Sequence, residues 1–283
     1  MASVFDDERV QALLELALRE DLGAGDRTSE ATVPASARAC GRLLAKELLV
    51  VCGLDALAAV FGRIGAGVDV ELLVADGHLA GPGEVVARAT GPARVLLAGE
   101  RLALNVLQHL SGIATVTRRC VERVAGTQLV IRDTRKTVPG MRVLAKYAVR
   151  VGGGENHRMA LDDAILVKDN HLALGGGDLA GAVRAARAAW PSLPLEVEVR
   201  TMAELDAAVA AGPDLILLDN MRPDEMAEAV RRVAGRVPLE ASGGIGPDEL
   251  PAVAATGVAY VAMGALTHSA PAVDLSFKLE PLA

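Results

Sequence analysis

The chain has 283 residues, of which 51% are hydrophobic and 2% aromatic, and 29 Lys and Arg against 36 Asp and Glu give it a formal net charge of -7. This is ample apolar content for a buried core, either in one large α/β domain or in two smaller ones, whereas an acidic chain with so few rings is a poor match for nucleic acid. No apolar run approaches the roughly 20 residues that span a bilayer, and the start of the chain shows no signal-peptide pattern, so we expect a cytoplasmic protein that does not enter a membrane.

The first part of the chain predicts a small α+β domain followed by a long helix. Acidic residues precede apolar residues at helical spacing in the first segment, and Leu-rich and Val-rich runs follow it. The predicted elements are a helix over 6–21, strands over 39–52 and 67–75 with a short helix over 54–64 between them, strands near 84–90 and 93–98, and a helix from about 99 to 124.

From Gln128 onward the pattern alternates between strand and helix. The strands expected are 129–132, 164–168, 195–199, 214–218, 237–241 and 258–263, and the helices expected lie near 140–150, 178–190, 202–211, 223–234 and 247–255. Nearly all-apolar strands that alternate with helices are typical of a parallel sheet covered by helices.

Polar residues gather where these strands end. Asp133 follows the first strand, Lys168 ends the second, and Asp219 ends the fourth. In a (β/α) barrel these positions form one face, on which active sites are built. Six strands are fewer than eight, so the sequence favours an incomplete barrel over a closed one.

One stretch, from Asp133 to His171, is basic within the acidic chain. It reads DTRKTVPGMRVLAKYAVRVGGGENHRMALDDAILVKDNH and contains three of the five lysines, Lys136, Lys146 and Lys168. Where Arg is the common cation, Lys offers a compact charge and a mobile amine. A local group of cations suits a small anionic substrate. The three cysteines lack CxxC spacing, which favours reduced, buried thiols.

The same stretch closely resembles the quinolinate phosphoribosyltransferases, decarboxylating enzymes that make nicotinate mononucleotide for NAD synthesis. The resemblance covers most of the chain in order, through ERLALNVLQHLSGIATVTR (100–118), LEVEV (195–199), LLDN (217–220), EASGGI (240–245) and GALTHS (264–269). It implies an N-terminal α/β open sandwich over 1–115, which the tail 270–283 rejoins, and an incomplete α/β barrel of fewer than eight strands over 116–269.

The resemblance also assigns an acceptor site. Quinolinate carries two adjacent carboxylates, and holding both calls for several cations, ideally Arg in bidentate geometry. The residues implied for this substrate are Arg101, Thr134, Arg135, Lys136, His157 and Arg158. Arg101 would reach the site from a neighbouring subunit of a homodimer.

The second substrate implied is phosphoribosyl pyrophosphate with Mg²⁺. Glycine-containing turns after the last two strands suit a phosphate group, because the backbone can approach it closely. The residues implied are Lys168, Glu198, Asp219, Ser242, Gly243, Gly244, Met263, Gly264 and Ala265, with His268 and Asn170 in support. Glu198 and Asp219 would hold the metal, directly or through water. The catalytic set would be Lys136, Lys168, Glu198 and Asp219.

Several alternatives stay open at this point. A related enzyme could use nicotinate, although a single carboxylate needs fewer cations than the stretch provides. Lys168 at a strand end could form a Schiff base in a barrel aldolase, or could pair with Glu198 as a structural ion pair. A small-anion sensor would bind without turnover, which the paired strand-end carboxylates disfavour.

Overall fold

The computed structural model describes residues 3–282, and the chain divides into two compact units. The first comprises the residues up to Arg118 together with Thr137–Gly153 and the residues from Thr267 onward. The second comprises Arg119–Lys136 and Gly154–Leu266. Each unit has its own sheet, so each is described by itself.

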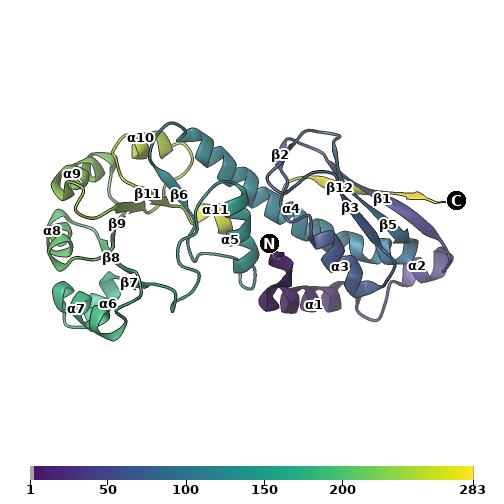
Figure 1. Cartoon of the computed structure of the whole chain (residues 1–283), viewed down its shortest axis with the longest axis horizontal. Helices are drawn as coiled ribbons and strands as arrows, with labels where there is room; N and C mark the ends of the chain where they lie inside the picture. Colours follow the sequence, from purple (N-terminus) through teal and green to yellow (C-terminus); the bar gives the residue numbers. More distant parts are fainter. Residues whose placement is uncertain (1–2, 283) are drawn as a thin grey trace. The chain divides into compact units, whose positions relative to one another are not determined.

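The first unit contains a four-stranded antiparallel sheet in the order β12-β1-β5-β3 and a small two-stranded sheet, β2-β4. Figure 1 shows the yellow C-terminal strand β12 beside the purple β1. The strands are β1 (Arg38–Ala45), β2 (Leu49–Val50), β3 (Asp69–Leu72), β4 (Leu79–Ala80), β5 (Val85–Pro92) and β12 (Leu275–Pro281). The helices are η1 (Val4–Asp6), α1 (Glu8–Leu22), α2 (Arg27–Thr32), α3 (Ala56–Ile64) and α5 (Arg142–Val151).

Phe277 of β12 packs against β1 and α3. Its ring lies over Gly41, where an added Cβ would come within 2.0 Å of the ring carbon Cζ. The same ring packs against Phe61 of α3, with 5.9 Å between the centroids. Helix α3 buries Leu57, Val60 and Phe61, at the three- and four-residue spacing of one helical face. The β12 strand therefore belongs to the core of the first unit.

The predicted strand at 93–98 is wrong, because those residues form the start of helix α4 (Ala93–Arg123). Ala93, Leu96 and Gly99 are buried, and this spacing of three continues the apolar face of the helix. The local β preference of Val95 and its neighbours is thus overridden by packing. The predicted strand over 39–52 is also interrupted, since β1 ends at Ala45 and β2 pairs separately with β4.

The second unit contains a six-stranded parallel sheet in the order β6-β11-β10-β9-β8-β7. Its strands are β6 (Val130–Arg132), β7 (Ile165–Val167), β8 (Leu195–Val199), β9 (Leu215–Asp219), β10 (Leu239–Ser242) and β11 (Tyr260–Ala262). Its helices are α6 (Asp169–Leu174), α7 (Leu179–Ala189), α8 (Met202–Ala211), α9 (Pro223–Val233) and α10 (Leu250–Ala254), and α11 (Ala265–His268) begins as the unit ends. Within residues 3–282 no pairing joins β6 to β7, so the sheet stays open.

Local sequence signals explain where the helices of this unit begin and end. Thr201 accepts a hydrogen bond from the Glu204 N–H, the Glu204 carboxylate accepts one in return, and Gly212 ends α8 in a left-handed conformation. Helices α7 to α10 lie along one side of the curved sheet (Figure 1). The predicted fold class, an N-terminal sandwich-like domain with an incomplete barrel of fewer than eight strands, is confirmed.

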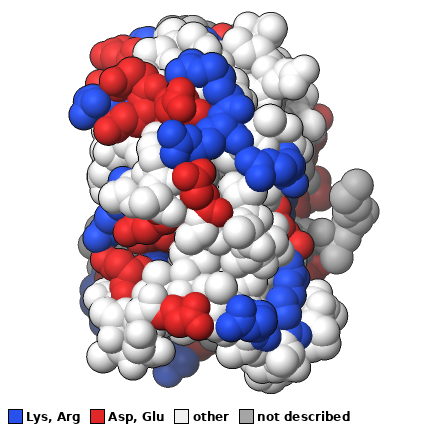
Figure 2. Space-filling view, turned by 90° about the vertical axis from the view of Figure 1, so that its left-hand side faces the viewer, with Lys and Arg blue, Asp and Glu red and all other residues white. Residues whose placement is uncertain are grey.

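The outer helices of the second unit carry acidic and basic side chains interspersed with each other, as Figure 2 shows for that face. Ion pairs join neighbouring helices there, for example Arg232 of α9 to Asp206 of α8 at 3.0 Å. Among the described residues, none of the helices combines the length and the hydropathy needed to cross a bilayer.

Candidate active site

The strand register places the chemically active residues of the second unit on one face of its sheet. Glu198 pairs with Leu217, Asp219 pairs with Ser242, and Ser242 pairs in turn with Ala262. Paired residues of neighbouring strands point to the same side, and residues two apart in a strand share a side. Polar side chains at the carboxyl ends of β8, β9 and β10 therefore converge.

They line a cavity of about 220 Å³. Its lining residues are Thr134, Arg135, Lys136, His157, Arg158, Leu166, Lys168, Glu198, Leu217, Asp219, Glu240, Ser242 and Ala262. Nine residues predicted from the sequence are among them, drawn from segments spread over more than a hundred residues of chain. We call this cavity the upper pocket, because it lies at the carboxyl ends of the strands.

Other residues predicted from the sequence do not line the upper pocket. Arg101 is exposed on α4 in the first unit, and Asn170 is exposed in α6. His268, exposed at the end of α11, lies 2.5 Å from the Ser269 hydroxyl through Nδ1. Gly243 and Gly244 follow β10, Met263 and Gly264 follow β11, and Ala265 is the first residue of α11.

Positive charge is concentrated at Arg135 and Arg158. Partial burial lowers the pKa of the Arg158 guanidinium, and the nearby Arg135 lowers it further. Arg158 Nη1 donates to the Ala164 carbonyl oxygen at 2.9 Å, which fixes the side chain. Two guanidinium groups held near each other repel, and an anion bound between them would relieve that repulsion.

Both strand-end carboxylates have a cation partner within the protein. Lys168 Nζ lies 2.7 Å from Glu198 Oε2, so the ion pair that the sequence offered as an alternative is present. Arg200 donates from Nε to Asp219 Oδ2 at 2.9 Å, and its Nη1 lies 2.6 Å from Asp169. An ammonium paired in this way lacks the lone pair that a Schiff-base lysine needs.

The turn after β10 depends on glycine. Gly243 has a φ of +107°, and an added Cβ would lie 2.2 Å from Asn220 Oδ1. Asn220 itself has a positive φ of 57° and donates its N–H to the Ser242 carbonyl oxygen at 2.8 Å. The backbone conformation of Gly243 accepts glycine and few other residues. The turn therefore exposes backbone in a fixed shape beside the upper pocket.

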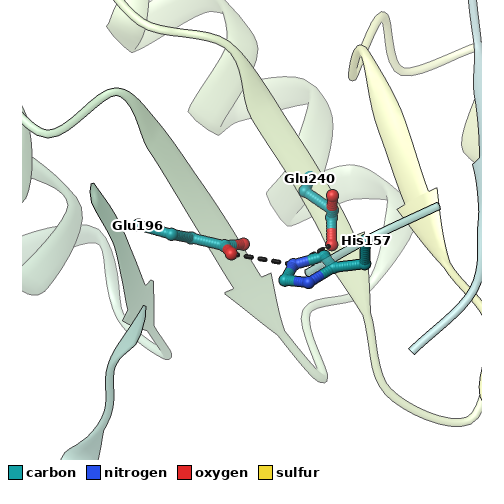
Figure 3. Close-up of side chains that lie close together, drawn as sticks. All are labelled: His157, Glu196 and Glu240. Carbon is teal, nitrogen blue, oxygen red and sulfur yellow. Dashed lines mark hydrogen bonds and ion pairs between the residues drawn. The ribbon is translucent and has the colours of Figure 1, made fainter. Parts of the chain in front are cut away.

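A group of ionisable side chains, two of which line the upper pocket, was mostly missed by the sequence analysis. His157 Nε2 is 2.8 Å from Glu196 Oε2 and 3.5 Å from Glu240 Oε1, and Arg132 Nη1 lies 3.0 Å from Glu240 Oε2. We call these four residues the His157 cluster, of which Figure 3 shows three. A signal existed in the sequence, since Glu196 precedes Glu198 by two residues and so shares its side of β8.

The fold and this pocket together define a barrel-like α/β enzyme site for small anionic substrates, at the carboxyl ends of parallel strands. A family model described as the C-terminal domain of quinolinate phosphoribosyl transferase matches residues 113–278, and the model of the N-terminal domain matches residues 26–111. The chain belongs to the quinolinate phosphoribosyltransferase family.

Curated relatives and solved structures agree with this assignment. The chain is 45% identical to a carboxylating nicotinate-nucleotide pyrophosphorylase of Mycobacterium leprae, over 99% of this chain and 100% of the relative. It is 42% identical to a probable enzyme of the same name from Bacillus subtilis, covering 95% and 92% of the two chains. The crystal structure of NadC from Streptococcus pyogenes superposes with a TM-score of 0.94 at 40% identity, covering 100% and 99% of the two chains.

Proposed function

We propose that this protein is a decarboxylating quinolinate phosphoribosyltransferase. It converts quinolinate and 5-phosphoribosyl 1-pyrophosphate to nicotinate mononucleotide, pyrophosphate and carbon dioxide, a reaction of NAD biosynthesis. The observation that carries the proposal is the convergence of Arg135, Lys136 and Arg158 with Glu198 and Asp219 in one pocket. The names of the relatives support the same reaction.

The acceptor's two carboxylates lie among Arg135, Lys136 and Arg158 in this proposal, with Thr134 as a further polar contact. Guanidinium groups suit carboxylates because two parallel N–H donors match the two oxygens. The repulsion between Arg135 and Arg158 supports a doubly charged acceptor over a singly charged one, since two carboxylates offset more of that repulsion than one.

The ribosyl donor lies toward the strand ends. Its 5'-phosphate is bound by the glycine turn Ser242–Gly244 and by the turn at Met263–Ala265, whose backbone N–H groups can reach phosphate oxygens. The Glu198 and Asp219 carboxylates hold the ribose hydroxyls, and Lys168 offsets charge on the departing pyrophosphate. The 2.7 Å between Lys168 Nζ and Glu198 Oε2 supports this arrangement, because it brings the two groups together in the same pocket.

The first chemical step is a displacement at the anomeric carbon of the ribose. The pyridine nitrogen forms the new C–N bond while the C–O bond to pyrophosphate breaks, through an oxocarbenium-like transition state. In the second step the bond between C2 and its carboxylate breaks and carbon dioxide leaves. The electron pair stays on C2, stabilised by the adjacent positive nitrogen, until C2 takes a proton from solvent. The protein's part is orientation and electrostatic stabilisation.

Mg²⁺ fits the residues present in this pocket. Glu198 and Asp219 each hold a cation already, and carboxylates with waters and phosphate oxygens are the ligands that Mg²⁺ prefers. When bound, the ion neutralises charge that develops on the pyrophosphate oxygens. Arg200 Nε lies 2.9 Å from Asp219 Oδ2, so this particular oxygen would reach the metal only if Arg200 moved away.

The active form in this proposal is a homodimer in which Arg101 of each chain completes the acceptor site of its partner. The exposure of Arg101 on α4 supports a role outside its own unit's core. We further propose that the enzyme works in the cytoplasm. Its cysteines are free thiols, two of them buried, as expected in a reducing compartment.

The proposal is tested by release of carbon dioxide from carboxyl-labelled quinolinate. Release that requires quinolinate, phosphoribosyl pyrophosphate and Mg²⁺ together, with nicotinate inert in parallel, is the expected result. Nucleotide formation from nicotinate with quinolinate inert would leave the phosphate site standing and overturn the acceptor assignment.

A further inference from the structure

The His157 cluster is built from four separate segments of chain, and its two carboxylates are buried. Glu196 lies in β8, Glu240 in β10 and Arg132 at the end of β6, and His157 comes from the loop before β7. The Glu240 side chain is fully buried, and that of Glu196 is 8% exposed. Figure 3 shows both carboxylates directed toward the imidazole ring. Burying two carboxylates side by side is unfavourable unless their partners are well placed.

The hydrogen bonds of His157 fix which of its ring nitrogens carries the proton. The backbone N–H of Arg158 donates to His157 Nδ1 at 2.8 Å. A backbone N–H can only donate, so Nδ1 must present its lone pair. In a neutral imidazole the proton is then on Nε2, where it is donated to Glu196 Oε2 at 2.8 Å. An imidazolium, protonated on both nitrogens, would direct an N–H at the Arg158 N–H.

Both ring nitrogens are consequently occupied by the protein. What the ring can offer the upper pocket is its faces and its C–H edges, because neither nitrogen is available to a ligand carboxylate. His157 and Arg158 also line a second cavity of about 280 Å³, which reaches Pro194 and Asp214 at the amino ends of the strands. The ring is thus part of a partition between two cavities.

The backbone that carries His157 is fixed as well. Asp133 is fully buried, accepts the His157 N–H at 3.0 Å and accepts the Asn156 side-chain amide at 2.5 Å. Glu155, two residues before His157, forms an isolated parallel bridge with Arg132, the last residue of β6. The ring position is therefore set by contacts with its backbone and with both of its nitrogens.

A metal ion is the main alternative occupant, since one His157 nitrogen and two carboxylate oxygens lie within 4.8 Å of one another. Two observations disfavour it. A metal on Nε2 of a neutral ring requires the proton on Nδ1, where the Arg158 N–H already points. Arg132, stacked 3.3 Å over the Tyr260 ring, already supplies a positive charge to Glu240.

Resting on the function proposed above, we propose that Glu196, Glu240 and Arg132 are positioning residues that hold His157 as a neutral Nε2–H imidazole. His157 is then an uncharged wall of the acceptor pocket, which replaces its predicted role as one of the cations that bind the acceptor's carboxylates. Charge recognition then belongs to Arg135, Lys136 and Arg158 together with Arg101 of the partner subunit, and the fixed ring sets where a flat heteroaromatic acceptor can lie.

The first test needs no substrate and reads the ring directly. Nitrogen-15 NMR of the labelled full-length protein, with the His157 signals assigned by their loss in His157→Gln, is expected to show protonated Nε2 and unprotonated Nδ1 from about pH 6 to pH 8. His171 serves as a comparison within the same spectrum. Its Nδ1 also accepts a backbone N–H, that of Lys168 at 3.0 Å, but the His171 side chain is exposed and lies outside the His157 cluster. A His157 protonated on both nitrogens at neutral pH would overturn the proposal.

The second test asks whether the ring position matters for the acceptor. Glu196→Leu removes the acceptor of the Nε2–H and is expected to raise the KM for quinolinate roughly tenfold or more, with the KM for phosphoribosyl pyrophosphate nearly unchanged. Glu196→Gln restores most of the loss, since its amide oxygen can accept the same proton. Glu155→Gln is the matched control: Glu155 lies 3.4 Å from Arg132 and is more than half exposed. It is expected to change neither KM.

The outcomes separate this proposal from the proposed function. If the wild-type protein does not turn over quinolinate, the function fails while the NMR result still stands. If Glu196→Leu raises both KM values equally, the cluster has only a structural role. Stoichiometric Zn²⁺ binding by the wild-type protein that Glu240→Gln abolishes would replace the positioning cluster with a metal site.

Discussion

Lys136 and Arg158 are the residues on which the acceptor assignment depends most. We expect Lys136→Ala and Arg158→Ala each to lower kcat/KM for quinolinate, because each removes a cation that orients a carboxylate. The loss of transition-state stabilisation should be about 2–4 kcal/mol for each variant. Steady-state rates measure this directly. Arg184→Ala is the control, since Arg184 is exposed on α7 and lies 3.6 Å from Asp178. Wild-type rates in both variants would remove these residues from the site.

The buried Glu240 carboxyl makes the free energy of unfolding fall as pH rises, which is opposite to the usual effect of an ion-paired carboxylate. Burial and the neighbouring Glu196 raise its pKa from 4.5 to about 7, and the Arg132 guanidinium offsets only part of this rise. The folded state therefore binds an extra proton between these values, and the contribution of Glu240 to stability falls as pH rises from about 4.5 to about 7.

We expect the free energy of unfolding of the wild type, minus that of Glu240→Gln, to decrease across this window. The shift sets an upper limit of about 3 kcal/mol for the decrease. Urea unfolding of both proteins at about pH 5 and about pH 8 measures it. A difference that does not change with pH would mean that Glu240 is ionised throughout the range.

At the scale of elements, helix α4 depends on a close approach at Gly112. An added Cβ would lie 2.1 Å from the Pro271 carbonyl oxygen, in the segment that leads to β12. We expect Gly112→Ala to destabilise the protein by about 1–3 kcal/mol, because backbone must move. Gly62→Ala in α3 is the counterpart: nothing lies within 4 Å, so the helix should gain about 0.5–1 kcal/mol. Thermal unfolding of both variants gives the two signs.

The sequence predicts the second unit better than the first, for a physical reason. Short apolar strands between polar turns leave little choice of structure, and β8 has the bounds that were predicted, 195–199. Residues 93–98 are apolar except for Arg94 and have no decisive period, so only packing shows that they belong to α4. Glu196 and Arg200 were missed because their roles depend on which strands are neighbours. The spacing of Glu196 and Glu198 shows that they share a side of β8, but which residues face them follows only from the sheet order.

At the scale of the whole molecule, the proposed exchange of Arg101 between subunits has a clear test. Arg101→Ala and Lys136→Ala are each expected to be nearly inactive. Co-expression of the two variants should restore up to about a quarter of wild-type activity, because half of the dimers then contain one intact site of two. Co-expressed Lys136→Ala and Arg158→Ala should restore nothing, since both residues belong to the same chain's pocket. Equal recovery in both mixtures, or none in either, would place Arg101 elsewhere.

The pairing of β12 with β1 also governs the order in which the molecule can be completed during synthesis. The strands β1, β3 and β5 leave the ribosome early, yet the second neighbour of β1, the strand β12, arrives only from Leu275, which is 183 residues after Pro92. At typical translation rates this interval lasts roughly 10–40 seconds. Throughout it, the edge of β1 and the space over Gly41 that the Phe277 ring later fills are open. An unpaired strand edge invites association with other chains, so the nascent protein is most vulnerable to aggregation, and most in need of a chaperone, until its last strand has been made.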